Sequence, residues 1–319
     1  MSKLRSDKRK KKKHFVLKII LITLLVIVLA AVALVGFAYW RTSSTFDKIH
    51  HPIEGKGSSG VALNGKTPFS VLIIGTDARG NERGRSDTLI AATVNGTKNK
   101  IQMLSIPRDT RAEIIGHNST EKINAAFAYG GVKMADATTT NFLNNIPFNY
   151  YIKINMEGFR DLVNAVGGVE VYNDKDGLTL NKQSSTGSQG TFNKGNIHLD
   201  GDQALAYVRI RKTDAEGDFG RQKRQQQLIS AIAEKALSTG LIWRFDGILN
   251  AIGKNIETDF TMNDITKIAK NYRNSLKNVE NLQVKGDGGK LNDGLWYYVV
   301  SEQERARLHD ELAKNLEIK

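Results

Sequence analysis

Acidic and basic side chains gather at three places in the sequence, each where a predicted strand ends or a loop begins. In the stretch GTDARGNERGRSDT, residues 75–88, Asp77 follows one such run and Asp87 precedes the next. Two carboxylates at one sheet edge can share a divalent cation of the Mg²⁺ type, which takes further ligands from phosphates and water. Guanidinium groups between them would bind those phosphates. The arginines in this stretch are Arg79, Arg83 and Arg85. The alternative is a surface hairpin with solvated ion pairs.

The second place is SIPRDT, residues 105–110, where Arg108 and Asp109 follow a strand directly. Ligands of α/β proteins usually bind where strands end and loops begin. Charges at such a position can also simply mark the exit of the strand into solvent.

The third place is YVRIRKTDAEGDFGRQKRQQQ, residues 207–227. Arg209 and Arg211 are two residues apart, so an extended segment would point both to one face. Arg221 opens a predicted helix, and Asp218 stands just before it, where a carboxylate can cap free N–H groups. Asp218 can therefore be a cap, a catalytic group, or both. We expect the other charges of this stretch to be mostly solvated: Lys212, Asp214, Glu216, Lys223 and Arg224.

The sequence contains none of the common nucleophile or nucleotide motifs. G-x-S-x-G, H-E-x-x-H and GxxxxGK[ST] are absent. There is also no cysteine, which excludes thiol catalysis, thiolate metal sites and disulfides. A site made of Asp and Arg suits phosphoryl or pyrophosphate chemistry, because guanidinium and metal charge stabilise the charge that develops around phosphorus.

The N-terminal region predicts a membrane anchor. Residues 1–18 carry a net charge of +8, which leaves +5 of the chain's +13 for the rest. Residues 19–40 are uncharged and would span about 33 Å as a helix, enough for a bilayer core of about 30 Å. The preceding basic residues favour a cytoplasmic N-terminus. A cleaved signal peptide would have a shorter apolar region and a cleavage site. The basic tail alone could suggest DNA binding. Directly before a membrane span, it is better explained as setting the orientation of the span and attracting anionic lipid.

The rest of the chain predicts a linker and one α/β domain with a central mixed sheet. The linker is 41–67, where we read the adjacent pair His50 and His51 as linker residues rather than metal ligands. Predicted strands are 69–75, 88–95, 100–106, 149–155 and 169–173. Predicted helices are 122–145 with an interruption at Gly130–Gly131, 156–168, a short helix running into an extended segment over 200–211, then 220–237, 242–253, 261–276 and 301–316. Residues 174–198 are expected to form a long loop or hairpin.

Several separate motifs occur in order between residues 68 and 235: LIIGTDAR, GRSDTLIAATVN, KIQMLSIPRDT, KINAAFAYGG, GFRDLVNAVGGVEV, LDGDQALAYVRIRK and GDFGRQKRQQQ. Together with the basic tail and the apolar span, they resemble the LytR-CpsA-Psr family. The resemblance implies an α-β-α layered catalytic domain over 68–319, with its motif core at 68–235 and a long apolar groove for a polyprenyl chain.

The resemblance also implies an activity. Such proteins are phosphotransferases on the outer face of mainly Gram-positive cells, anchored in the cytoplasmic membrane by one span. They move a glycopolymer (wall teichoic acid, capsule or another wall polysaccharide) from a polyprenyl-pyrophosphate donor to peptidoglycan, at the C6 hydroxyl of muramic acid. Nucleic acid is not an expected partner.

The family's site residues transfer to matching positions of this sequence. The ligands of Mg²⁺ or Mn²⁺ would be Asp77 and Asp87. The resemblance implies that the catalytic groups include Asp87, Asp218 and Arg108, with either Asp87 or Asp218 acting on the acceptor hydroxyl. The residues that bind pyrophosphate would be Arg85, Arg108, Arg209, Arg211, Arg221 and Gln225. Lys122 and Asn124 are weaker candidates, as are Arg79 and Arg83.

Two other function classes stay open. One is a non-catalytic protein that binds wall polymers or polyprenyl phosphates. The other is a transcriptional regulator or attenuator, which only the basic tail supports, since so short a segment cannot form a DNA-binding domain.

Overall fold

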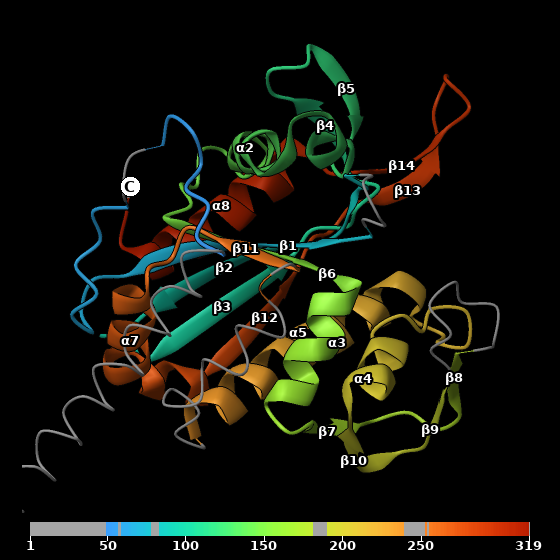
Figure 1. Cartoon of the computed structure of the whole chain (residues 1–319). Helices are drawn as coiled ribbons and strands as arrows, with labels where there is room; N and C mark the ends of the chain where they lie inside the picture. The colour runs from blue at the N-terminus through green and yellow to red at the C-terminus, as the bar shows by residue number, and fades with distance from the viewer. Residues whose placement is uncertain are drawn as a thin grey trace, which may run out of the picture. The chain divides into compact units, whose positions relative to one another are not determined.

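The computed structural model of the chain describes residues 49–56, 59–77, 83–180, 190–238, 253 and 255–318 (Figure 1). All of them lie in one compact unit, Phe46–Lys319. The predicted tail 1–18 and the predicted span 19–40 fall outside the described residues, as does the predicted helix 242–253 apart from residue 253. Within the described ranges, no helix is long and apolar enough to cross a membrane.

A six-stranded mixed sheet forms the centre of the domain, as the sequence predicts. Its strand order is β11-β6-β1-β2-β3-β12. The pairs β1–β6 and β3–β12 are parallel, whereas β1–β2, β2–β3 and β6–β11 are antiparallel. The strands are β1 (Phe69–Thr76), β2 (Ser86–Asn95), β3 (Lys100–Ser105), β6 (Tyr150–Asn155), β11 (Ile256–Thr258) and β12 (Val279–Gln283).

Helices cover both faces of this sheet, which gives three layers (Figure 1). The cause is the alternation of apolar residues along the strands. On β1, Phe69 and Val71 belong to one apolar cluster, and Leu72 and Ile74 belong to the other. The first face is covered by α3 (Met156–Ala165), α4 (Gly201–Tyr207), α5 (Gly217–Ser238) and α7 (Met262–Asn271), with the 3₁₀ turn η2 (Arg273–Lys277) after α7. The second face is covered by α2 (Ala125–Phe142) and α8 (Glu302–Leu316).

Glycines break two helices where the sequence predicts it. Gly131 has φ 64° and ψ −150°, a backbone conformation that interrupts α2 and is open to glycine because it lacks a Cβ. Helix α3 ends before Gly167 and Gly168, whose φ values are 80° and 76°. Such left-handed residues are the usual end of a helix.

Four two-stranded sheets lie outside the central sheet. Residues 169–173 form a strand as predicted, but it pairs with a strand from the predicted loop 174–198 instead of joining the central sheet. The four pairs are β7 (Val169–Asn173) with β10 (Gly195–Leu199), β8 (Leu178–Leu180) with β9 (Gly190–Phe192), β4 (Arg111–Ile114) with β5 (Ser119–Lys122), and β13 (Asp287–Lys290) with β14 (Trp296–Val299).

The described part of the predicted linker packs on the domain. Ile49 and Leu63 are buried in the core. The His51 N–H donates to the Thr258 carbonyl at 2.8 Å, and the His50 ring nitrogen Nδ1 lies 2.8 Å from the Phe260 carbonyl. The folded domain therefore begins before residue 68.

Candidate functional site

Asp77 and Asp87 lie at the end of the β1–β2 hairpin where the chain passes from one strand to the next. Gly75 pairs with Thr88 and Thr76 with Ser86, so Asp87 is the extra residue of a β-bulge. Bulges of this kind re-aim a side chain at a sheet edge. Asp77 stays in register with the other strand, because its Oδ1 accepts a hydrogen bond of 2.8 Å from the Arg85 N–H.

Arg108 joins this sheet edge from the end of β3. Its Nη1 is 2.7 Å from Asp87 Oδ1, and both side chains are about three-quarters buried. Burial opposes the charge on Arg108, but the hydrogen bond and the charge of Asp87, with smaller contributions from Asp109 and Asp218, raise its pKa above the ordinary value. The ends of β1 and β3 and the start of β2 meet at one edge, because β2 is antiparallel to both neighbours.

Helix α5 brings Asp218 and Arg221 to the same place. Asp218 Oδ1 lies 2.9 Å from Arg221 Nη2. Burial lowers the pKa of Arg221, and the nearby cations Arg108 and Arg211 lower it further. The carboxylates of Asp218 and Asp87 oppose this shift. These mutual effects show that five predicted site residues form one cluster: Asp87, Arg108, Arg211, Asp218 and Arg221.

Two atoms of this cluster are buried without a hydrogen bond. They are Arg221 Nε and Asp218 Oδ1, which contacts Arg221 Nη2 as an ion pair without hydrogen-bond geometry. Buried polar atoms are nearly always hydrogen-bonded, so unpaired ones call for an explanation such as a missing ligand or water. The prediction that Asp218 precedes the helix is wrong, since it is the second residue of α5, where its charge still interacts favourably with the helix dipole.

Arg209 and Arg211 do not lie in an extended segment. Residues 208–216 form a series of turns between α4 and α5. Arg209 is half-buried, whereas Arg211 is exposed. The Thr213 hydroxyl of this segment hydrogen-bonds to the backbone of Thr179 in β8, and the Ile210 carbonyl is bound by a side chain.

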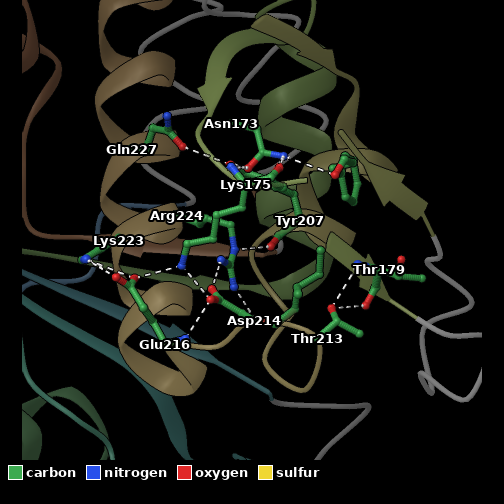
Figure 2. A network of polar contacts seen from close by, with 12 residues as sticks. Asn173, Lys175, Thr179, Tyr207, Thr213, Asp214, Glu216, Lys223, Arg224 and Gln227 are labelled. Carbon is green, nitrogen blue, oxygen red and sulfur yellow. Dashed lines mark hydrogen bonds and ion pairs between the residues drawn. The ribbon is translucent and has the colours of Figure 1, made fainter. Parts of the chain in front are cut away.

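That side chain is Arg224, at the centre of the network in Figure 2. Its Nε donates to the Tyr207 carbonyl at 3.0 Å and its Nη2 to the Ile210 carbonyl at 2.5 Å. Its Nη1 forms an ion pair with Asp214. Arg224 is only 5% exposed, and its guanidinium also lies over the Tyr207 ring. All three guanidinium nitrogens therefore hold the loop that carries Arg209 and Arg211.

The expectation that Asp214 and Arg224 are solvated is wrong. Asp214 is buried, and burial favours its neutral form, but hydrogen bonds from Arg224 and Lys175 and from the Glu216 N–H lower its pKa to about 2. Lys212, Glu216 and Lys223 are exposed, as expected. The sequence did contain an indication that Arg224 is buried, because Arg224 lies four residues before the buried Leu228, on the same side of the helix.

The other predicted residues occupy the border of the cluster. Gln225 is half-buried and follows Arg221 by one helical turn. Arg85 is exposed, and Arg83 Nη1 donates to the Tyr129 carbonyl at 3.1 Å. Lys122 forms an ion pair of 2.7 Å with Asp109. Asn124 is buried with an unpaired Oδ1, whereas Arg79 lies outside the described residues.

A cation at this edge would need ligands beyond the protein. In the part of the chain that the structure describes, no group of three or more His, Asp or Glu side chains could hold a metal ion. Asp77 and Asp87 supply two carboxylates, and the hydroxyls of Thr76 and Ser86 beside them are buried without partners. This oxygen-only set fits Mg²⁺, which commonly keeps waters and binds one or two carboxylates plus substrate phosphates.

The fold and the cluster define a class of protein: a mixed α/β domain with an acidic and arginine-rich site at one sheet edge. The profile of the LytR_cpsA_psr family matches residues 36–314. The chain is 44% identical over 284 residues (88% of this chain, 90% of the relative) to the polyisoprenyl-teichoic acid–peptidoglycan teichoic acid transferase TagU of Bacillus cereus. It is 39% identical to the Bacillus subtilis protein of the same name, covering 98% of this chain and all of that one.

Solved structures share the fold. A structure described as TagT bound to LI-WTA aligns with a TM-score of 0.70 and 32% identity, covering 84% of this chain and all of that one. The chain therefore belongs to the LytR-CpsA-Psr family.

Proposed function

We propose that the chain is a phosphotransferase that moves a wall glycopolymer from a polyprenyl-pyrophosphate donor to peptidoglycan. The relatives named above as teichoic acid transferases support the type of polymer and the acceptor. The observation that carries the proposal is the cluster of Asp87, Arg108, Asp218 and Arg221, with its two unpaired buried atoms. A pyrophosphate offers the acceptor oxygens that buried guanidinium groups require.

In this proposal, the chain's own residues perform three tasks. Arg108 and Arg221 bind pyrophosphate oxygens and stabilise the negative charge that grows on the leaving group. The acceptor hydroxyl oxygen forms a bond to the sugar-linked phosphorus as the bond from that phosphorus to the bridging oxygen breaks, which releases polyprenyl phosphate. The hydroxyl proton goes to a carboxylate. Asp87, which is paired with Arg108, and Asp218, which is paired with Arg221, are the two candidates for this role.

Asp77 and Asp87 are the residues that would hold Mg²⁺ or Mn²⁺. The ion would supply positive charge next to the pyrophosphate. The partly solvated position of both carboxylates leaves them open to water and phosphate ligands.

A half-buried apolar strip beside the cluster is suited to the polyprenyl chain. On β1, Val71 is buried, but Ile73, nearer to Asp77 on the same face, is half-buried. Three neighbouring side chains are also half-buried: Ile152 and Ile154 of β6 and Phe159 of α3. Apolar side chains in the middle of a helix-covered sheet are usually fully buried. We propose that this strip is part of the long apolar groove that the family resemblance implies.

Residues 1–18 and 19–40 complete the proposal as a cytoplasmic tail and a single membrane span, with the domain outside the cell. This arrangement would place the domain beside a membrane-borne donor and next to peptidoglycan.

The test is covalent attachment of labelled polymer to peptidoglycan by the purified full-length protein, given donor and Mg²⁺. We expect wild type to attach it and two variants to lose turnover: Asp77→Asn, which keeps the acceptor for the Arg85 N–H, and Arg211→Gln. Lys212→Gln, which removes the exposed charge next to Arg211, is the matched control and should stay active. Full activity of either variant would refute the site. Absence of attachment by wild type would instead indicate a non-catalytic binding protein.

A further inference from the structure

A cavity of about 740 Å³ lies on the other side of α5 from the catalytic cluster. Asp218, Arg221 and Gln225 share one side of the helix, because they are three or four residues apart. Gly220, Lys223 and Gln227 lie on the opposite side and line the cavity. The cavity therefore lies outside the catalytic cluster, although the first turns of α5 border both.

Positive side chains from four separate elements reach this cavity: Lys175 after β7, Lys223 of α5, Lys285 after β12 and Arg307 of α8. Only two carboxylates line it, Asp174 and Glu216. The fifth cation in the lining is Arg224, whose charge the buried Asp214 compensates. Glu304 compensates Arg307 in the same way, so three lysines face two carboxylates and the cavity has a surplus of one positive charge.

The cations differ in how they are engaged. Lys175 and Lys223 both bind Glu216, at 3.0 Å and 2.9 Å (Figure 2). Arg307 binds Glu304 at 2.7 Å. Lys285 forms no ion pair with any of the described residues. Lys285 does interact electrostatically with Glu304, whose pKa is lowered by Arg307 and, to a smaller extent, by Lys285. An anion in the cavity would give Lys285 a direct ion pair and could share Lys223 with Glu216, since Lys223 and Glu216 are both exposed.

The remaining lining suits sugars or polyols. Tyr172 is 53% exposed and offers a ring face on which a sugar or polyol can pack. Two exposed amide groups that donate and accept hydrogen bonds line the cavity as well: Asn281 and Gln283. Lysines, amides and an exposed aromatic ring together fit a sugar-phosphate or polyol-phosphate chain better than a purely apolar ligand.

We infer that this cavity binds a sugar-phosphate or polyol-phosphate segment of the donor polymer, at least one repeat away from the pyrophosphate. The inference rests on the proposed function, because it assumes that the donor carries such a polymer. With its pyrophosphate at Arg221, the chain would pass the first turns of α5 to reach Lys223. The cavity would then favour donors with long polymers.

The test compares two donors with the same lipid pyrophosphate, one carrying a single disaccharide and one carrying a poly(glycerol phosphate) chain. Full-length wild type and the full-length variant Lys223→Gln/Lys285→Gln are assayed separately in detergent with each donor. Each exposed charge contributes about two- to fivefold in such contacts, so we expect KM for the long donor to rise about tenfold with kcat unchanged. KM for the short donor should not change.

The control is Lys267→Gln/Lys270→Gln, which removes two exposed charges from α7 and should affect neither donor. Equal effects on both donors, or none on either, would overturn the inference.

Direct binding keeps the test independent of turnover. Soluble poly(glycerol phosphate) should bind wild type more tightly than the Lys223→Gln/Lys285→Gln variant. Adding Tyr172→Ala to that variant should weaken polymer binding further. Equal binding by wild type and variant would also overturn the inference. Loss of polymer transfer by wild type with normal oligomer binding would refute the proposed function alone.

Discussion

Arg221 and Arg224 are one helical turn apart on α5, yet their surroundings differ. Every guanidinium nitrogen of Arg224 is engaged by Tyr207, Ile210 or Asp214. Arg221 is almost as buried, with 11% of its side chain exposed, but its Nε has no hydrogen bond. Burial alone therefore does not separate a structural arginine from one that binds a ligand. The difference lies in the hydrogen bonds that the protein leaves unmade.

The largest effect should follow from removal of Arg221. We expect Arg221→Met to lower kcat/KM for polymer transfer by about 10³-fold, because one preorganised donor to the developing charge is lost. The free energy of unfolding should fall less than for Arg224→Met, because the Asp218 carboxylate left behind is about one-third exposed, whereas the Asp214 side chain is fully buried. Steady-state kinetics and urea unfolding measure the two quantities. A stability loss as large as that of Arg224→Met would show that Arg221 is structural as well.

Arg224→Met should mainly lower stability. The change leaves Asp214 buried with only Lys175 as an ionic partner and frees two backbone carbonyls, so we expect a loss of about 3 kcal/mol in urea unfolding. The double variant Arg224→Met/Asp214→Leu should recover part of that loss, because no uncompensated carboxylate remains. If the single variant is as stable as wild type, the network in Figure 2 does not hold the loop.

Asp214 should make stability depend on pH in acid. Its pKa in the folded protein is about 2, below the usual value of 3.8, so its stabilising contribution is complete above about pH 4. This contribution, about 2 kcal/mol, is lost as pH falls through 2. The difference in unfolding free energy between wild type and Asp214→Asn should therefore shrink between pH 4 and pH 2. A constant difference over that range would contradict the assigned ion pairs.

The smallest effect should come from Lys223. Lys223 and Glu216 are both exposed, and exposed ion pairs contribute little because water screens them. Lys223→Gln should change the free energy of unfolding by less than about 0.5 kcal/mol. A loss close to that of Arg224→Met would mean that the exposed pair also holds the loop.

The sequence predicts β1, β2, β3 and β6 of the central sheet and the meeting of Asp87 with Arg108, because strand ends are marked by the change from apolar to charged residues. It does not predict β11. Nor does it predict β12, whose residues VENLQ lack a clear apolar alternation. The sequence also does not predict the bulge at Asp87, since the bulge depends on how two strands pair.

Loop 208–216 shows why other predictions failed. We expected an extended segment, in which a spacing of two residues would place Arg209 and Arg211 on one face. Its actual turns depend on Arg224, and that contact joins residues distant in sequence. Likewise, nothing in the composition distinguishes the buried Asp214 from the exposed Glu216 two residues later.

The most direct test of the central claim is a crystal structure of the protein with a polyprenyl-pyrophosphate donor and Mg²⁺. The account predicts pyrophosphate oxygens within about 3 Å of the Arg108 and Arg221 guanidinium groups, one of them accepting a hydrogen bond from Arg221 Nε. A pyrophosphate in the cavity beside Lys223 and Lys285, with Arg221 Nε still unpaired, would contradict it.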